Sequence, residues 1–183
     1  MAYFFFDFKD KTKQDSRALL SSLLIQLSDQ SDAFCDTLFN LYSAHNRGSE
    51  QPTDDSLAEC LKAMLSILGQ VPIYLIVDAL DESPNDSGIP SSRERVLELV
   101  KELVERRHSN LHLCITSRPE FDIRTVLQSL ATQKISLHDE RGQQRDICHF
   151  VNFVVHSDRR MKRWRDDDKD AVIETLSQKA DGM

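Results

Sequence analysis

Apolar residues occur along the chain in two kinds of pattern, short continuous runs and helical repeats. Continuous runs at 3–8, 73–77 and 111–116 predict strands that are buried on both faces, as in a parallel sheet covered by helices. A further strand is expected around 134–138. Four strands are therefore predicted, separated by stretches long enough to hold helices.

Leucines and other apolar residues recur at helical spacing between and after these runs. The sequences Thr12–Asp15 and Ser91–Glu94 have the form of capping boxes and predict the starts of two helices. Gly69 is expected to end the third helix. Seven helices are predicted. Four of them are expected around the apolar residues of 20–27, 57–68 and 147–154 and after Ser91. The other three are expected to cover about 32–44, 121–130 and 169–180.

The order of these elements predicts the fold class. Strands alternate with helices as far as about residue 142, which predicts an α/β domain with a parallel sheet and helices on both of its faces. Only helices are expected after that point. The chain is therefore predicted to contain an α/β domain at 1–142 and the start of a helical subdomain at 143–183.

Composition and charge narrow the possible functions. The chain has 183 residues and a net charge of -7, which disfavours a general nucleic-acid or membrane-surface binder. A basic stretch at 159–165 is followed at once by three aspartates at 166–168, so we expect these charges to pair with each other. No apolar run approaches the roughly 18–20 residues that cross a bilayer, and no signal peptide is visible.

The four cysteines are widely spaced and have no metal-ligand spacing. Each lies in an apolar stretch, so buried free thiols are expected rather than disulfides. This pattern is typical of a reducing compartment and predicts a cytoplasmic protein.

The ends of two predicted strands carry side chains suited to phosphate chemistry. The run at 73–77 leads into Asp78, Asp81 and Glu82, and the run at 111–116 leads into a hydroxyl pair and Arg118. Ligands of open α/β folds bind at the carboxyl edge of the sheet, where these residues are expected to meet. Acids there can hold a hydrated divalent cation and orient a water beside a phosphate. The pattern predicts nucleotide chemistry.

These segments resemble NACHT-type P-loop nucleotidases of the signal-transduction (STAND) class, and in particular the fungal nephrocystin-like N-terminal family. The resemblance covers essentially the whole chain and is carried by the sequences FFFDFKD at 4–10, DALDE at 78–82, TSRP at 116–119 and KADGM at 179–183. It implies a three-layer parallel sheet of the P-loop NTPase type that binds Mg²⁺ and ATP or GTP.

The resemblance also implies roles for the acidic residues. Asp78 matches the Walker B aspartate, which helps to hold Mg²⁺ through its water shell. Asp81 and Glu82 match an acidic pair that is expected to position or polarise the attacking water.

On the next strand, Arg118 matches the sensor arginine that faces the γ-phosphate, and Thr116 and Ser117 are expected to hydrogen-bond nearby. In the intact family, nucleotide binding and slow hydrolysis act as a conformational switch. Protein partners are then expected through repeat and effector domains, or through self-association.

One part of the family pattern is absent. None of the five glycines is followed by lysine, so the chain has no G-x-x-x-x-G-K-[ST] loop. In the family this loop and its strand lie just upstream of the segment that matches 3–8, and that strand is central in the sheet, beside the one that ends at Arg118. The chain is therefore expected to be a fragment without the Walker A segment and with unpaired strand edges.

Two other functions fit parts of this pattern. A non-catalytic remnant could act by docking onto an intact relative, through its unpaired strand edges. A metal-dependent phosphoesterase without a P-loop would need a second set of ligands at other strand ends, where only Asp139 and Glu140 follow His138.

Overall fold

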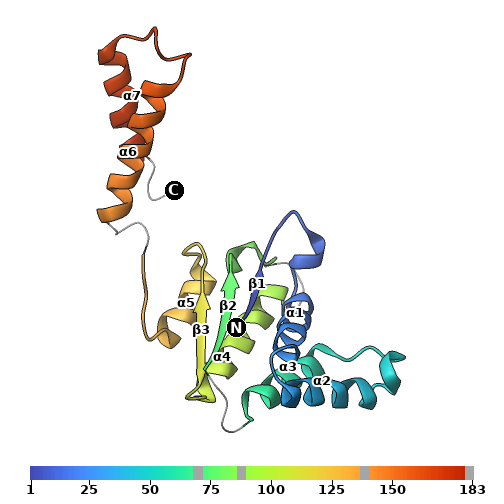
Figure 1. Ribbon diagram of the computed structural model, residues 1–183. Coiled ribbons are helices and arrows are strands. Elements are labelled where there is room, and N and C mark those ends of the chain that lie inside the picture. Colours follow the sequence, from blue (N-terminus) through green and yellow to red (C-terminus); the bar gives the residue numbers. More distant parts are fainter. Residues whose placement is uncertain (68–71, 86–89, 137–140, 180–183) are drawn as a thin grey trace. The chain divides into compact units, whose positions relative to one another are not determined.

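The computed structural model describes residues 1–67, 72–85, 90–136 and 141–179. The chain forms two compact units, Met1–Ala131 and Thr132–Met183. Figure 1 shows that the first unit holds the sheet with its helices and that the second is a pair of helices. The functional division into 1–142 and 143–183 stays a prediction.

Three parallel strands form the sheet of the first unit, in the order β1-β2-β3. They are β1 (Ala2–Phe5), β2 (Ile73–Asp78) and β3 (Leu111–Ile115). Tyr3 lies opposite Ile76, and Ile76 lies opposite Cys114, so β2 is central. The three apolar runs thus form strands, as predicted. The strand expected at 134–138 is wrong for 134–136, which have no regular structure, and 137–138 lie outside the described residues.

Five α-helices of the described residues belong to this unit. They are α1 (Ser16–Ser28), α2 (Asp32–Ala44), α3 (Asp54–Leu65), α4 (Ser92–Glu105) and α5 (Phe121–Leu130). The capping box of α4 is confirmed: the Ser91 side chain accepts from the backbone N–H of Glu94, and the Glu94 side chain accepts from that of Ser91.

The capping box expected at Thr12 is wrong. Thr12 lies in a short 3₁₀ turn, η1 (Lys11–Lys13), and the cap of α1 is Asp15, whose carboxylate accepts from the backbone N–H of Ala18 at 2.8 Å. An aspartate caps a helix as well as a threonine does, so the helix begins three residues later than the pattern suggested. The stop expected at Gly69 lies outside the described residues; α3 itself ends at Leu65.

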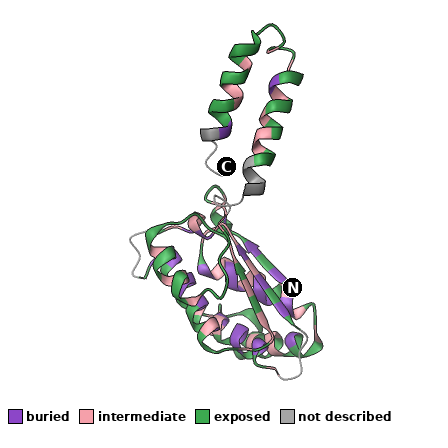
Figure 2. Ribbon diagram, turned by 90° about the vertical axis from the view of Figure 1, so that its left-hand side faces the viewer, coloured by how far each residue is buried: buried purple, intermediate pink, exposed green. Residues whose placement is uncertain are grey.

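The helices of the first unit cover one face of the sheet. Phe4, Leu75 and Val77 point into a core with leucines of α1, α3 and α4, whereas Tyr3 and Tyr74, on the other face, are 46% and 49% exposed. Figure 2 shows the buried residues between the sheet and these helices. Helices were predicted on both faces, and within this unit that is wrong. Right-handed crossovers place all connecting helices on one face when each new strand is added on the same side.

The prediction of buried cysteines holds only for Cys60, although all four thiols are free. The side chain of Cys114 lies on the outer face of β3, and Cys35 lies on the solvent side of α2; both thiols are exposed. Cys148 is partly buried. An apolar neighbourhood in the sequence does not specify which side of a strand or helix a thiol occupies.

The second unit consists of α6 (Arg141–Ser157) and α7 (Asp166–Lys179). The helix expected from 169 begins earlier because Asp166 to Asp168 form its first turn, where carboxylates are stabilised by the positive end of the helix. Lys169 lies 3.0 Å from Asp166 and lowers the pKa of that carboxyl by hydrogen bonding. Across both units, no helix in the described part of the chain is both long and apolar enough to span a membrane.

Candidate functional site

The loops after the three strands meet at the carboxyl edge of the sheet. The backbone N–H of Phe6, just after β1, donates to the carbonyl of Asp78 at 3.1 Å. The backbone N–H of Thr116, just after β3, donates to the carbonyl of Val77 at 3.0 Å. The parallel pairing therefore continues past the strand ends and places the predicted residues of β2 and β3 next to each other.

Asp78 and Thr116 form the first pair at this edge. The Thr116 hydroxyl donates to Oδ1 of Asp78 and accepts from the backbone N–H of Ala79 at 3.0 Å. The carbonyl of Thr116 accepts from Leu80 N–H, also at 3.0 Å. Between these contacts Ala79 has φ 54° and ψ 46°, a left-handed conformation that is uncommon for alanine. Thr116 thus holds both the Asp78 carboxylate and the turn that follows it.

Asp81 and Arg118 form the second pair. Oδ1 of Asp81 accepts from the backbone N–H of Arg118 at 2.9 Å, and Oδ2 lies 3.5 Å from Nε of the same residue. The Asp81 side chain is only 8% exposed, but that of Arg118 is 82% exposed. The aspartate therefore fixes the backbone at Arg118 and pairs with one edge of its guanidinium, while most of the side chain is exposed to solvent and accessible to a ligand.

Glu82 is directed to the first loop instead. Its Oε2 accepts from the backbone N–H of Phe8 at 3.1 Å. The buried hydroxyl of the next residue, Ser83, donates to the carbonyl of Gln14 at 3.1 Å, and the amide of Gln14 donates to the carbonyl of Phe8 at 2.5 Å. The segment 7–10, which is part of the FFFDFKD sequence that carries the family resemblance, is therefore tied to the acidic loop.

Ser117 does not join this group. Its hydroxyl donates to the carbonyl of Arg118 at 3.0 Å, within its own loop. Five of the six predicted residues thus make contacts between neighbouring loops at the edge of the sheet, and the sixth contacts only its own segment.

Sequence reasoning missed Arg93, in the first turn of α4. Its guanidinium donates to the carbonyl oxygens of Ser83 at 3.0 Å and Asp81 at 2.6 Å, and to the carboxylates of Glu120 and Asp122. A cation in the first turn of a helix opposes the helix dipole. That unfavourable placement was the signal available in the sequence.

Comparison with known protein families gives a match to the family model described as nephrocystin 3, N-terminal, over residues 1–118. The chain belongs to this family. The nephrocystin 3 N-terminal match spans β1 to β3 and ends at Arg118, so it includes all six predicted site residues. The nephrocystin-like resemblance is thereby confirmed. No curated protein and no solved structure matches the chain.

Asp78 is the residue at this edge whose side chain could hold Mg²⁺. Among the residues that the structure describes, no three His, Cys, Asp or Glu side chains gather as a metal-binding group. Mg²⁺ does not need such a cage, because it commonly binds through one or two carboxylates together with water and substrate phosphates. The Asp78 carboxylate, partly exposed and held by Thr116, has the hard oxygen atoms that this mode requires.

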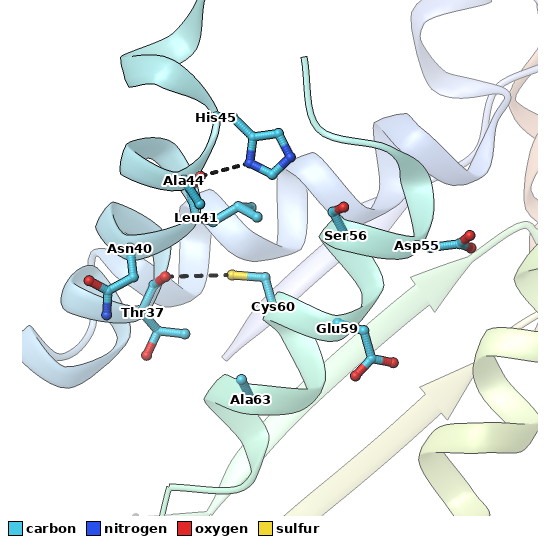
Figure 3. A pocket seen from close by; sticks show the side chains of 10 residues that line it. All are labelled: Thr37, Asn40, Leu41, Ala44, His45, Asp55, Ser56, Glu59, Cys60 and Ala63. Carbon is cyan, nitrogen blue, oxygen red and sulfur yellow. Dashed lines mark hydrogen bonds between the residues drawn. The ribbon is translucent and has the colours of Figure 1, made fainter. Parts of the chain in front are cut away.

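A separate groove of about 520 Å³ lies between α2 and α3, and Figure 3 shows the side chains that line it. The Cys60 thiol lies 3.9 Å from the carbonyl of Thr37, and Nδ1 of His45 is 2.9 Å from that of Leu41. Burial raises the pKa of the Cys60 thiol, which makes it a poor nucleophile at neutral pH. None of the predicted site residues lines this groove.

Proposed function

We propose that the carboxyl edge of the sheet is the metal and triphosphate side of a nucleotide site of the NACHT, P-loop type. In the intact protein, binding and slow hydrolysis of ATP or GTP would act as a conformational switch. The observation that carries this proposal is the pairing of Asp78 with Thr116 and of Asp81 with Arg118 at the ends of two adjacent parallel strands. Phosphoryl transfer depends mainly on positioning and charge neutralisation, and this arrangement supplies acids and a cation at one edge.

Asp78 is the residue proposed to hold Mg²⁺. One of its oxygens accepts from the Thr116 hydroxyl, and this hydrogen bond limits the rotation of the carboxylate. When bound, Mg²⁺ would neutralise charge on the phosphates. Thr116 therefore has a proposed supporting role, keeping Asp78 directed toward the ligand and fixing the turn at Ala79.

Arg118 is proposed to contact the terminal phosphate. Its backbone is anchored by Asp81 and its guanidinium is exposed, so the side chain can turn toward a ligand without any movement of the strand. Asp81 and Glu82 are proposed to orient the attacking water. Ser117, whose hydroxyl lies in the same loop, is proposed to hydrogen-bond near the phosphates once a ligand occupies the edge.

Equilibrium binding of a fluorescent ATP analogue, with and without Mg²⁺, tests this function. Asp78→Asn removes the charge that the metal needs and keeps the side-chain shape. Asp36→Asn, an exposed position on α2, is the matched control for loss of one negative charge. We expect Mg²⁺-dependent binding that is lost in Asp78→Asn and kept in Asp36→Asn, and competition with ATP and GTP would give the base preference. No binding at millimolar nucleotide, by a chain that circular dichroism shows to be folded, would contradict the proposal that this edge of the sheet binds nucleotide within the chain.

That negative outcome would favour docking onto an intact relative without nucleotide. One observation supports this second function: the outward face of the sheet is apolar and exposed, with Tyr3, Phe5 and Tyr74 each about half exposed. Exposed aromatic side chains gathered on one face are typical of protein interaction sites. Binding to such a relative should then be insensitive to Mg²⁺ and nucleotide.

A further inference from the structure

Arg93 connects the two loops that carry the predicted site. On one side its Nε and Nη2 donate to the carbonyl oxygens of Ser83 and Asp81, at 3.0 and 2.6 Å, in the loop after β2. On the other side its Nη1 donates to Glu120 and, at 3.3 Å, to Asp122, in the segment that follows β3. One guanidinium therefore contacts both loops at the same time.

The placement of this arginine is costly for the fold. Its side chain is 7% exposed, and a charged group removed from water must be fully hydrogen-bonded to be tolerated. It also lies in the first turn of α4, at the positive end of the helix. Neither feature benefits the helix. The stabilising contacts of the Arg93 guanidinium are to the loop after β2 and to Glu120 and Asp122 at the start of α5.

These contacts close a ring through the candidate site. Arg93 binds the backbone carbonyl of Asp81, and the carboxylate of Asp81 accepts from the backbone N–H of Arg118. Two residues further along, Glu120 returns to Arg93. Asp81 is thus tied to the buried cation directly, and Arg118 is tied to it through the Asp81 carboxylate and through Glu120 in the same segment.

We propose that Arg93 is a positioning residue, whose guanidinium fork holds the Asp81–Glu82 turn against the Arg118 segment so that both face one nucleotide. This inference rests on the proposed function for its ligand, while the bridge between the loops is a property of the chain itself. This role requires the planar guanidinium with its several N–H donors. Lysine, a point charge, could reach the carboxylates but could not donate to both carbonyl oxygens in the same geometry.

The test uses the full chain with Arg93→Met and Arg93→Lys. Lys62→Met is the matched control, because Lys62 is also a buried cation, 8% exposed, that contacts two carboxylates, Glu59 and Glu102, outside the candidate site. Two quantities are measured for each variant. One is the exchange rate of the Arg118 backbone amide, followed by nuclear magnetic resonance and referred to global stability. The other is affinity for the fluorescent ATP analogue with Mg²⁺.

We expect the Arg118 amide to exchange about tenfold faster or more in Arg93→Met, because the Asp81 carboxylate that accepts its hydrogen bond is then no longer held in place by Arg93. Nucleotide affinity should fall by a similar factor, Arg93→Lys should recover neither property fully, and Lys62→Met should change neither. Equal effects of Arg93→Met and Lys62→Met would overturn the proposal, as would full recovery by lysine or unchanged affinity despite faster exchange. If the unaltered chain binds no nucleotide, the proposed function fails. Faster exchange of the Arg118 amide that is confined to the Arg93 variants would then still support the bridge between the loops. Unchanged exchange in these variants would overturn the bridge.

Discussion

Ala79 offers a direct test of the geometry on which the candidate site depends. It joins Asp78 to the turn that holds Asp81, and its φ of 54° and ψ of 46° lie in the left-handed region. For a residue with a Cβ atom this conformation costs about 1–2 kcal/mol. Glycine adopts it without that cost. Ala79→Gly therefore removes a local strain and keeps every backbone hydrogen bond of the turn.

The expected size follows from two opposing effects. Relief of the left-handed conformation stabilises the folded chain by about 1–2 kcal/mol. The greater freedom of glycine in the unfolded chain offsets about 0.4–1 kcal/mol of this. The free energy of unfolding should thus rise by between about zero and about 1.5 kcal/mol. The matched control is Ala63→Gly, an exposed position in α3, where the same substitution should lower it by about 1 kcal/mol.

Urea unfolding followed by tyrosine fluorescence measures both variants. All three tyrosines lie in the unit Met1–Ala131, and a Trp164→Phe background removes the single tryptophan, which belongs to the other unit. Midpoints can be compared if the denaturant slope is unchanged. A loss of stability in Ala79→Gly as large as that in Ala63→Gly would refute the left-handed turn. The placement of Asp78 and Asp81 relative to each other would then be wrong as well.

Three further predictions concern single side chains. Thr116→Val removes the hydroxyl that donates to Asp78 and should lower the free energy of unfolding by about 1 kcal/mol, measured by urea midpoint; an unchanged midpoint would show that this hydroxyl holds nothing. Because burial raises the pKa of the Cys60 thiol, this thiol should react with iodoacetamide at least about tenfold more slowly than exposed Cys35, as followed by mass spectrometry. Equal labelling rates of the two thiols would contradict the burial of Cys60. As the pH rises above 9.0, this thiol ionises in the unfolded chain before it ionises in the folded chain, so the free energy of unfolding should fall with rising pH. Desolvation by burial lowers the pKa of Lys62, but hydrogen bonds to Glu59 and Glu102 outweigh this effect and raise the pKa overall. Both glutamates are more than half exposed, so Lys62→Met should change the free energy of unfolding by no more than about 1 kcal/mol. A larger loss in thermal or urea unfolding would contradict this.

The strands were the most predictable part of the fold. Runs such as 73–77 are apolar at every position and end in charge, and few structures other than a sheet strand accommodate such a run in an α/β chain. Helix positions were also predictable within a few residues, because leucine spacing and the Ser91 cap are local signals. Local patterns therefore recovered the element order of the first unit.

The covering of the sheet was not predictable in the same way. Tyr74 and Ile76 are apolar like their buried neighbours, yet they point away from the helices. Which face receives the helices depends on the order in which strands are added to the sheet, and this is a property of the whole chain rather than of any one segment. The thiol of Cys114 was misplaced for the same reason.

The sequence allowed most residues of the candidate site to be predicted, but not which of them contact each other. Asp81 and Glu82 follow one strand and were expected to act as an acidic pair on the attacking water. The 3₁₀ turn η3 (Leu80–Glu82) instead directs successive side chains about 120° apart, so Asp81 meets Arg118 and Glu82 meets the backbone of the first loop. Arg93 joins the group only through tertiary contacts, which a single sequence does not specify.

The parallel order of the strands has a consequence for how the chain folds. β1 precedes α1, α2 and α3, and its only strand partner among the described residues is β2, which follows all three helices. During synthesis β1 therefore has no strand partner until the later strand β2 has been made. Contacts between elements so far apart in sequence form slowly, because a long loop must close before they gain any stabilisation. We expect the helices to associate first and the sheet, with the loops that carry the acids and the arginine, to be completed last.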